Sequence, residues 1–120
     1  MKYYRKDWIL FQEVANEGGK VPETFKETTI KSDDPDKNKH VPYIEETKDG
    51  YKVKVGKNEF HATDSEHHTM FIELVVDNQF YYKKIIKLNE KPEADFKINK
   101  GKEVKAYAFC NLHGLFEYKM

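Results

Sequence analysis

Cysteine is almost absent from this chain of 120 residues, since Cys110 is the only one. A single cysteine excludes an intrachain disulfide, so nothing in the sequence indicates an oxidising compartment. Long apolar runs are also lacking. The longest wholly apolar run near the N-terminus, Trp8 to Phe11, is too short for the core of a signal peptide or for a membrane span. These absences predict a cytoplasmic protein with no membrane partner.

Neither sign of charge is in excess, because 21 basic and 21 acidic residues cancel. A chain without a net field is not steered to nucleic acid or to an anionic membrane, so neither partner is expected. Charged residues nevertheless make up 35% of the chain, and eight Tyr and eight Phe lead its hydrophobic residues. This composition predicts one compact domain with an aromatic-rich core and room for a small additional lobe.

No segment shows a sustained apolar stripe with the period of a helix. From residue 40 onward the pattern is that of short strands separated by turn signals, and Asp77-Asn78 is a typical two-residue hairpin turn. The expected strands cover residues 40–44, 51–55, 70–76, 80–88, 96–98, 104–109 and 115–118. This spacing predicts an all-β fold, an immunoglobulin-like antiparallel β-sandwich of about seven strands.

Residues 1–36 follow a different pattern. Residues 3–14 fit a strand pair or an irregular lobe, and residues 16–19 form a turn signal. Residues 32–38 are a polar linker that contains a proline. We therefore expect a small N-terminal lobe with its linker in residues 1–36 and the sandwich in residues 37–120.

The placement of the histidines and the cysteine predicts a metal site. His40 begins an expected strand, His61 and His67 flank a loop, and Cys110-Asn-Leu-His113 lies between two strands. Residues at loop ends can converge at one end of a sandwich, because strands position their connecting loops rigidly. Four imidazoles and a thiolate suit a borderline-to-soft transition metal and not calcium or magnesium.

The number of ligands separates the candidate metals. Structural zinc usually closes at four ligands, and a blue-copper site needs an axial methionine, for which only the last residue, Met120, lies downstream. Four histidines in a plane with an axial thiolate leave a sixth position open to a substrate. Two other interpretations stay open. One is an iron or blue-copper-like electron carrier that uses the same residues, and the other is a metal-free binding module in which they merely pack.

Five segments within residues 39–118 resemble one known family. They are Lys39–Glu45, Tyr51–Gly56, His61–His67, Phe71–Leu74 and Tyr107–Gly114, and they include a His-x5-His and a Cys-x2-His spacing. Together they resemble the superoxide reductases, the family of neelaredoxin and of the catalytic domain of desulfoferrodoxin. The resemblance implies an immunoglobulin-like sandwich and an oxidoreductase that reduces superoxide to hydrogen peroxide at one mononuclear iron (Fe2+/Fe3+).

The resemblance also implies roles for individual residues. Lys39 would attract the anionic substrate, whereas His68 falls outside the pattern and should point away from the metal as the strand neighbour of His67. The family's usual electron donor is a rubredoxin-like protein, and we expect a homo-oligomer, either a dimer or a tetramer. The implied ligands are four equatorial histidines and one axial cysteine, namely His40, His61, His67, His113 and Cys110.

The chain departs from the family at several positions. Asn38 stands where the family commonly has a glutamate, and an asparagine cannot supply an anionic ligand to the sixth position. Phe116 replaces a usual tryptophan, which is a change of packing. Residues 1–5 resemble the start of desulfoferrodoxins, whose first domain binds a second iron through four cysteines. Because residues 1–109 contain no cysteine, we expect a degenerate desulforedoxin-like lobe without metal.

Overall fold

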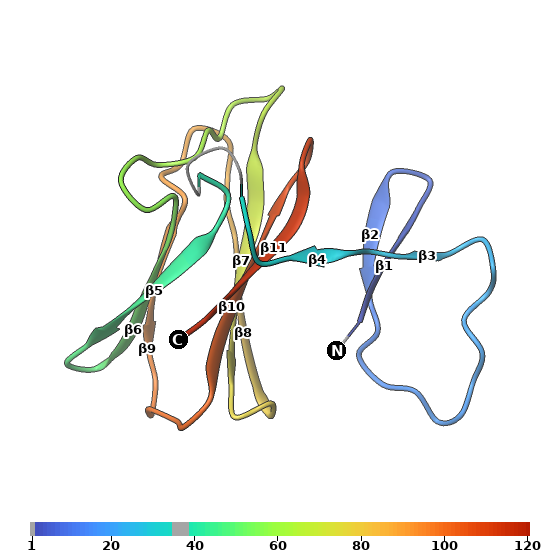
Figure 1. Cartoon of the computed structure of the whole chain (residues 1–120), viewed down its shortest axis with the longest axis horizontal. Helices are drawn as coiled ribbons and strands as arrows, with labels where there is room; N and C mark the ends of the chain where they lie inside the picture. Colours follow the sequence, from blue (N-terminus) through green and yellow to red (C-terminus); the bar gives the residue numbers. More distant parts are fainter. Residues whose placement is uncertain (1, 35–38) are drawn as a thin grey trace.

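The computed structural model describes residues 2–34 and 39–120, which form eleven strands in three sheets. Two sheets, with strand orders β4-β11-β10-β7-β8 and β5-β6-β9, face each other as a sandwich. The third, with the order β2-β1-β3, forms a lobe beside the sandwich, and β4 connects the two (Figure 1). Within the described ranges, no helix is long and apolar enough to cross a membrane.

The sandwich confirms the all-β fold class. Its seven main strands pair antiparallel, and the short β4 adds to the edge of the larger sheet in parallel with β11. The larger sheet consists of β4 (Ile30–Lys31), β7 (Thr69–Val76), β8 (Phe80–Ile85), β10 (Val104–Cys110) and β11 (Gly114–Lys119). The smaller sheet consists of β5 (Pro42–Thr47), β6 (Gly50–Val55) and β9 (Glu93–Lys97).

Three strand boundaries differ from the sequence prediction by three residues, and the first is the end of β5, which lies at Thr47 and not at Ile44. β8 ends at Ile85 and not at Leu88, because the Lys87 N–H turns to bind the Glu90 carboxylate at 2.9 Å. β9 begins at Glu93 and not at Phe96. Glu93 and Asp95 flank Ala94, which is 2% exposed. A single small apolar side chain between two charged residues gives little of the alternation that predicts a strand.

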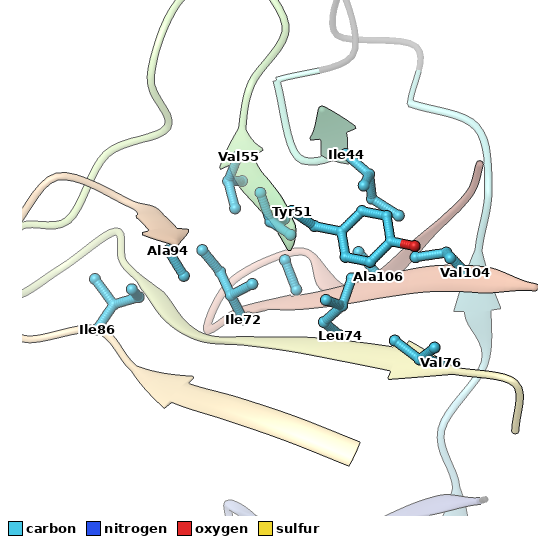
Figure 2. Packing of buried hydrophobic residues seen from close by; sticks show 12 residues of the cluster. Ile44, Tyr51, Val55, Ile72, Leu74, Val76, Ile86, Ala94, Val104 and Ala106 are labelled. Carbon is cyan, nitrogen blue, oxygen red and sulfur yellow. The ribbon is translucent and has the colours of Figure 1, made fainter. Parts of the chain in front are cut away.

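The core lies between the two sheets (Figure 2). Alternate side chains of each strand face inward, as the pleat requires. Tyr51 and Val53 from the smaller sheet meet Ile72 and Leu74 from the larger sheet, and all four are at most 2% exposed. Burying an aliphatic side chain of this size contributes about 1.5–3 kcal/mol, so this layer holds the two sheets at a fixed separation.

Tight hairpins also position the strands. Asp77 and Asn78 have positive φ angles of 52° and 54°, which confirms the predicted turn between β7 and β8. The turn between β5 and β6 lies at Lys48-Asp49, because Gly50 is already paired in β6. A Cβ atom at Gly50 would lie 2.0 Å from the Phe96 carbonyl oxygen, so only glycine lets β9 approach so closely.

The N-terminal lobe consists of β1 (Tyr3–Lys6), β2 (Ile9–Gln12) and β3 (Lys26–Glu27). Tyr3 is 2% exposed and packs with Phe71, Phe109 and Leu115 of the sandwich. The division of the chain at residue 36 stays a prediction, since β4 lies before that boundary but pairs with β11. At the other end of the β1–β2 hairpin, Trp8 is 94% exposed.

Candidate metal centre

The five ligand candidates of the sequence analysis lie at one end of the sandwich, where several connections between strands meet. His40 precedes β5, and His61 follows β6 at the position where its N–H binds the Val55 carbonyl at 3.0 Å. His67 precedes β7, which pairs with β10, and Cys110 is the last residue of β10. His113 lies in the turn that leads to Gly114, whose φ of 93° suits a glycine in a tight connection.

Four of these side chains form one compact group. The ligand atoms of His40, His67, Cys110 and His113 all lie within 4.8 Å of one another. The His40 Nε2 and His113 Nδ1 atoms are 3.0 Å apart, and the Cys110 Sγ atom is 3.5 Å from His113 Nδ1. Donor atoms at these separations can surround a single metal ion.

His61 completes the set of rings although it lies outside that group of four. Its ring centroid is 4.6 Å from that of His40 and 4.4 Å from that of His67. The Ala62 carbonyl and the Thr69 hydroxyl hold His61 Nδ1 at 2.8 Å and 2.7 Å, whereas Nε2 is buried and has no partner in the part of the chain that the structure describes. The Nε2 atom of His67 is likewise buried and unpaired among the described residues. Unpaired buried nitrogens are costly unless a ligand satisfies them, so both fit metal coordination.

The loop that carries His67 is held in place by a side chain. The Asp64 carboxylate accepts hydrogen bonds from the N–H groups of Glu66 and His67, at 3.0 Å and 2.8 Å. His68 turns away from the group, because its Nε2 atom lies 3.1 Å from the carbonyl oxygen of Ile86. The His67 and His68 side chains therefore leave the chain in different directions.

Sequence reasoning missed one contact at this site. The Asp34 Oδ2 atom lies 2.8 Å from both the backbone nitrogen and the ring Nδ1 of His40. Asp34 stands in the polar linker, where a carboxylate is ordinarily a solvated group, so the only available signal was its position six residues before a candidate ligand. Lys39 lies in the turn directly before His40, whereas Asn38 lies outside the described residues, so the expectation about it stays a prediction.

Residues 32–119 match the family model described as Desulfoferrodoxin. The chain belongs to the desulfoferrodoxin family. It is 49% identical over 78 residues to the desulfoferrodoxin of Nitratidesulfovibrio vulgaris, a match that covers 65% of this chain and 60% of that protein. The chain thus spans about three fifths of the length of this curated relative.

Two further relatives are matched over nearly their full length. The superoxide reductase of Pyrococcus abyssi is 41% identical over 106 residues, covering 74% of this chain and 91% of that protein. The crystal structure of the superoxide reductase from Treponema pallidum superposes with a TM-score of 0.76 at 26% identity, covering 98% of this chain and 97% of that one. That coverage includes the N-terminal lobe of this desulfoferrodoxin-family chain as well as its sandwich.

Burial favours the neutral form of two imidazoles of this desulfoferrodoxin-family site, those of His61 and His113. The pKa of His61 is lowered to about 4, chiefly because burial disfavours the charged ring and also because other imidazoles surround it. The pKa of His113 is lowered for the same two reasons. Neutral imidazoles have the free lone pair that a metal needs, so these rings are ready to coordinate at physiological pH.

The pKa of the Cys110 thiol is shifted upward, in the opposite direction to the pKa values of the two histidines. Burial raises the pKa of Cys110, although the backbone N–H groups of His113, Leu112 and His68 partly oppose this effect. A metal coordinates the thiolate, so binding must displace the Cys110 proton. The donor set of imidazoles and one sulfur fits a transition metal such as iron, and it does not fit a hard cation that prefers oxygen ligands.

Proposed function

We propose that this chain is a superoxide reductase, which reduces superoxide to hydrogen peroxide by one electron at a mononuclear iron. The observation that supports this most is the convergence of four imidazoles and one thiol, with two inward-facing nitrogens that no described protein group satisfies. Relatives named superoxide reductase in P. abyssi and T. pallidum support the same substrate.

In this proposal one iron is held by five protein ligands. The four imidazoles and the thiolate would hold the iron, and a ligand position not taken by the protein would be open to superoxide. The Cys110 thiolate would donate electron density to the iron, as a thiolate does in thiolate-ligated haem. The assigned ligands are His40, His61, His67, His113 and Cys110.

Iron held in this way supplies the electron that superoxide accepts. The protein's own residues bring the substrate in and control its surroundings. Lys39 is a compact cation directly before His40, so it attracts a small anion to this end of the sandwich. Superoxide also needs two protons to leave as hydrogen peroxide, and water beside Lys39 supplies them. His40 and His61 are 4% and 6% exposed, so they close the inner side of the site to solvent.

The geometry argues against a blue-copper carrier. Such a site needs a weak axial methionine near its Cys and His ligands. The Met120 N–H binds the Val104 carbonyl at 3.0 Å, and Val104 begins β10 whereas Cys110 ends it. Met120 therefore lies about 20 Å of extended strand away from the thiol, given a rise of about 3.3 Å per residue.

The proposed reaction needs partners. An external donor must reduce the iron after each turnover, and a small rubredoxin-like protein of the cytoplasm is the donor we assign. We also assign a homo-oligomer, either a dimer or a tetramer, in which a second copy covers exposed apolar side chains of the lobe and of the neighbouring sandwich strands. Trp8, Ile9, Met70 and Ile85 are 41–94% exposed and line one 390 Å³ cavity between lobe and sandwich. An apolar surface of this kind marks a contact between proteins more often than a free face.

Metal analysis after anaerobic purification tests the proposal. We expect about one iron per chain, because residues 1–109 offer no thiolate for a second centre. Cys110→Ser should remove the thiolate-to-iron charge-transfer absorption while leaving the fold intact, because the two side chains have similar volumes. Stoichiometric zinc without iron, or unchanged colour in the variant, would contradict the proposal.

A further inference from the structure

Asp34 makes an unusually specific contact with a candidate ligand. Its Oδ2 atom accepts hydrogen bonds from the His40 backbone N–H and from the His40 ring at Nδ1, each at 2.8 Å. The two side chains are only 3% and 4% exposed. Burying a carboxylate this deeply costs free energy, and hydrogen bonds to the charged group must offset that cost.

The other site histidines are held differently. His61 Nδ1 meets a carbonyl and a hydroxyl, both of which are neutral. His113 Nδ1 faces His40 and the thiol of Cys110. Among the described residues, His40 is the site histidine whose ring is hydrogen-bonded to a carboxylate.

The contact also determines which His40 nitrogen is free. A neutral imidazole has one N–H donor and one acceptor nitrogen. When Nδ1 donates to Asp34, Nε2 must carry the lone pair, and Nε2 is the atom that lies 3.0 Å from His113 Nδ1 inside the group of ligand candidates. The Phe116 ring stacks on one face of the His40 imidazole, with ring centroids 4.9 Å apart and an interplanar angle of 16°. The hydrogen bond to Asp34 therefore orients Nδ1, and the stacking on Phe116 restrains the tilt of the imidazole ring.

We infer that Asp34 is the positioning residue of this centre. It holds His40 in the Nδ1–H tautomer, directs Nε2 at the metal, and places a negative charge one imidazole away from it. This inference rests on the proposed iron site and deepens it. Carboxylates that accept from a ligating histidine raise the basicity of the ring, and their loss typically weakens metal affinity by about 10- to 100-fold.

The linker that carries Asp34 is itself attached to the site. β4 pairs with β11 at Leu115 and Phe116, and the Lys31 ammonium donates to the His113 carbonyl at 2.9 Å. Asp34 follows three residues later and returns to His40. The segment from Lys31 to Asp34 therefore contacts two of the candidate ligands, His113 and His40, and does not only connect the lobe to the sandwich.

The decisive variant is Asp34→Asn, because an amide has nearly the same shape and can still accept hydrogen bonds but carries no charge. Asp33→Asn is the matched control, since it removes the same charge from the exposed neighbouring residue. In the metal-free protein, nitrogen NMR of the imidazoles reports the His40 tautomer. In the iron-loaded protein, chelator competition reports ferrous affinity and a redox titration reports the reduction potential.

We expect Asp34→Asn to lower ferrous affinity by about 10- to 100-fold, to raise the reduction potential, and to let the His40 tautomers mix. Asp33→Asn should change none of these. The inference is overturned if Asp34→Asn matches the wild type in tautomer, affinity and potential, or if it lowers thermal stability alone, which would reveal a purely structural clamp. Wild-type protein that binds no iron would overturn the proposed function instead, and the metal-free NMR comparison would still decide whether Asp34 sets the tautomer.

Discussion

The side chain of Asn111 accepts a hydrogen bond from the backbone N–H of His68 at 2.8 Å. Its amide nitrogen also donates to the Glu66 carbonyl at 2.9 Å, and its backbone N–H binds the His68 carbonyl at 3.2 Å. Asn111 thus forms hydrogen bonds to Glu66 and His68, the residues on either side of His67. The loop that carries the thiol and the loop that carries His67 are joined through Asn111.

Asn111→Ala should therefore loosen both loops at once. It removes the hydrogen bonds to the part-buried His68 N–H and to the exposed Glu66 carbonyl, each worth about 0.5–1.5 kcal/mol. Urea denaturation should show this loss, and iron should dissociate faster from the variant. Leu112→Ala, at a neighbouring side chain that is 62% exposed, is the control that should change neither property. Equal stability and iron retention in the two variants would contradict this role.

The adjacent histidines His67 and His68 should respond differently to substitution. His67→Ala removes an inward-facing nitrogen and should lose iron or bind it weakly. His68→Ala removes only a contact with the Ile86 carbonyl, at a cost of about 1 kcal/mol, and should keep its iron. Iron per chain after anaerobic purification measures both. The opposite pattern would mean that the ligand of the pair had been assigned wrongly.

The packing of the N-terminal lobe on the sandwich should become less stable at alkaline pH. The Tyr3 hydroxyl donates to the buried Glu73 carboxylate, which Gln12 and Lys83 also contact. Burial and this hydrogen bond raise the pKa of Tyr3 above its ordinary value of 10.0. A phenol whose folded pKa exceeds its unfolded pKa contributes stability that is complete below about pH 10 and is lost as the pH rises further.

Urea unfolding of the wild type should therefore show a falling free energy above pH 10, by up to about 1.4 kcal/mol per pH unit from this group. Tyr3→Phe should lower stability at pH 7, because Glu73 loses a donor, and should lack this alkaline component. Tyr4→Phe, one residue along the same strand, is the matched control. The prediction fails if Tyr3→Phe and the wild type show the same alkaline slope.

Lys39 should influence the approach of the substrate. The chain has no net charge, so attraction of an anion must come from local groups. Lys39→Ala should slow the second-order reaction with superoxide and reduce the dependence of its rate on salt, because a screened attraction has been removed. Stopped-flow or pulse-radiolysis rates over a range of ionic strength measure this.

The control for Lys39 is Lys48→Ala. Lys48 lies in the β5–β6 turn, at the opposite end of β5 from His40, and its loss removes the same charge far from the site. If both lysine variants show the wild-type rate and salt dependence, Lys39 is an ordinary solvated loop residue.

Much of the fold was predictable because its signals are local. The alternation of Tyr51, Val53 and Val55 with lysines, and the turn residues Asp77 and Asn78, specify strands and hairpins from neighbouring residues alone. The spacing of the histidines and the cysteine likewise places each one in, or next to, a connection between strands. Convergence then follows from the sandwich, since its connections meet at its two ends.

The structural features that could not be predicted from the sequence depend on contacts between residues far apart in the chain. The parallel pairing of β4 with β11 joins residues some eighty positions apart, and a two-residue strand has no periodicity. The Asp34–His40 contact joins a residue of the polar linker to a candidate ligand, and a polar composition does not predict which residue makes such a contact. The exposure of Trp8 could not be predicted either, since an aromatic beside Ile9 and Leu10 normally indicates burial.

The central claim is tested most directly by counting products. Anaerobically reduced, iron-loaded protein is mixed with a limiting amount of superoxide, and hydrogen peroxide and dioxygen are both quantified. A reductase passes one electron to each superoxide, so we predict one peroxide for each superoxide consumed and no dioxygen. Equal amounts of peroxide and dioxygen would show dismutation, and no consumption beyond the uncatalysed rate would show an electron carrier or a binding module; either result would contradict the account.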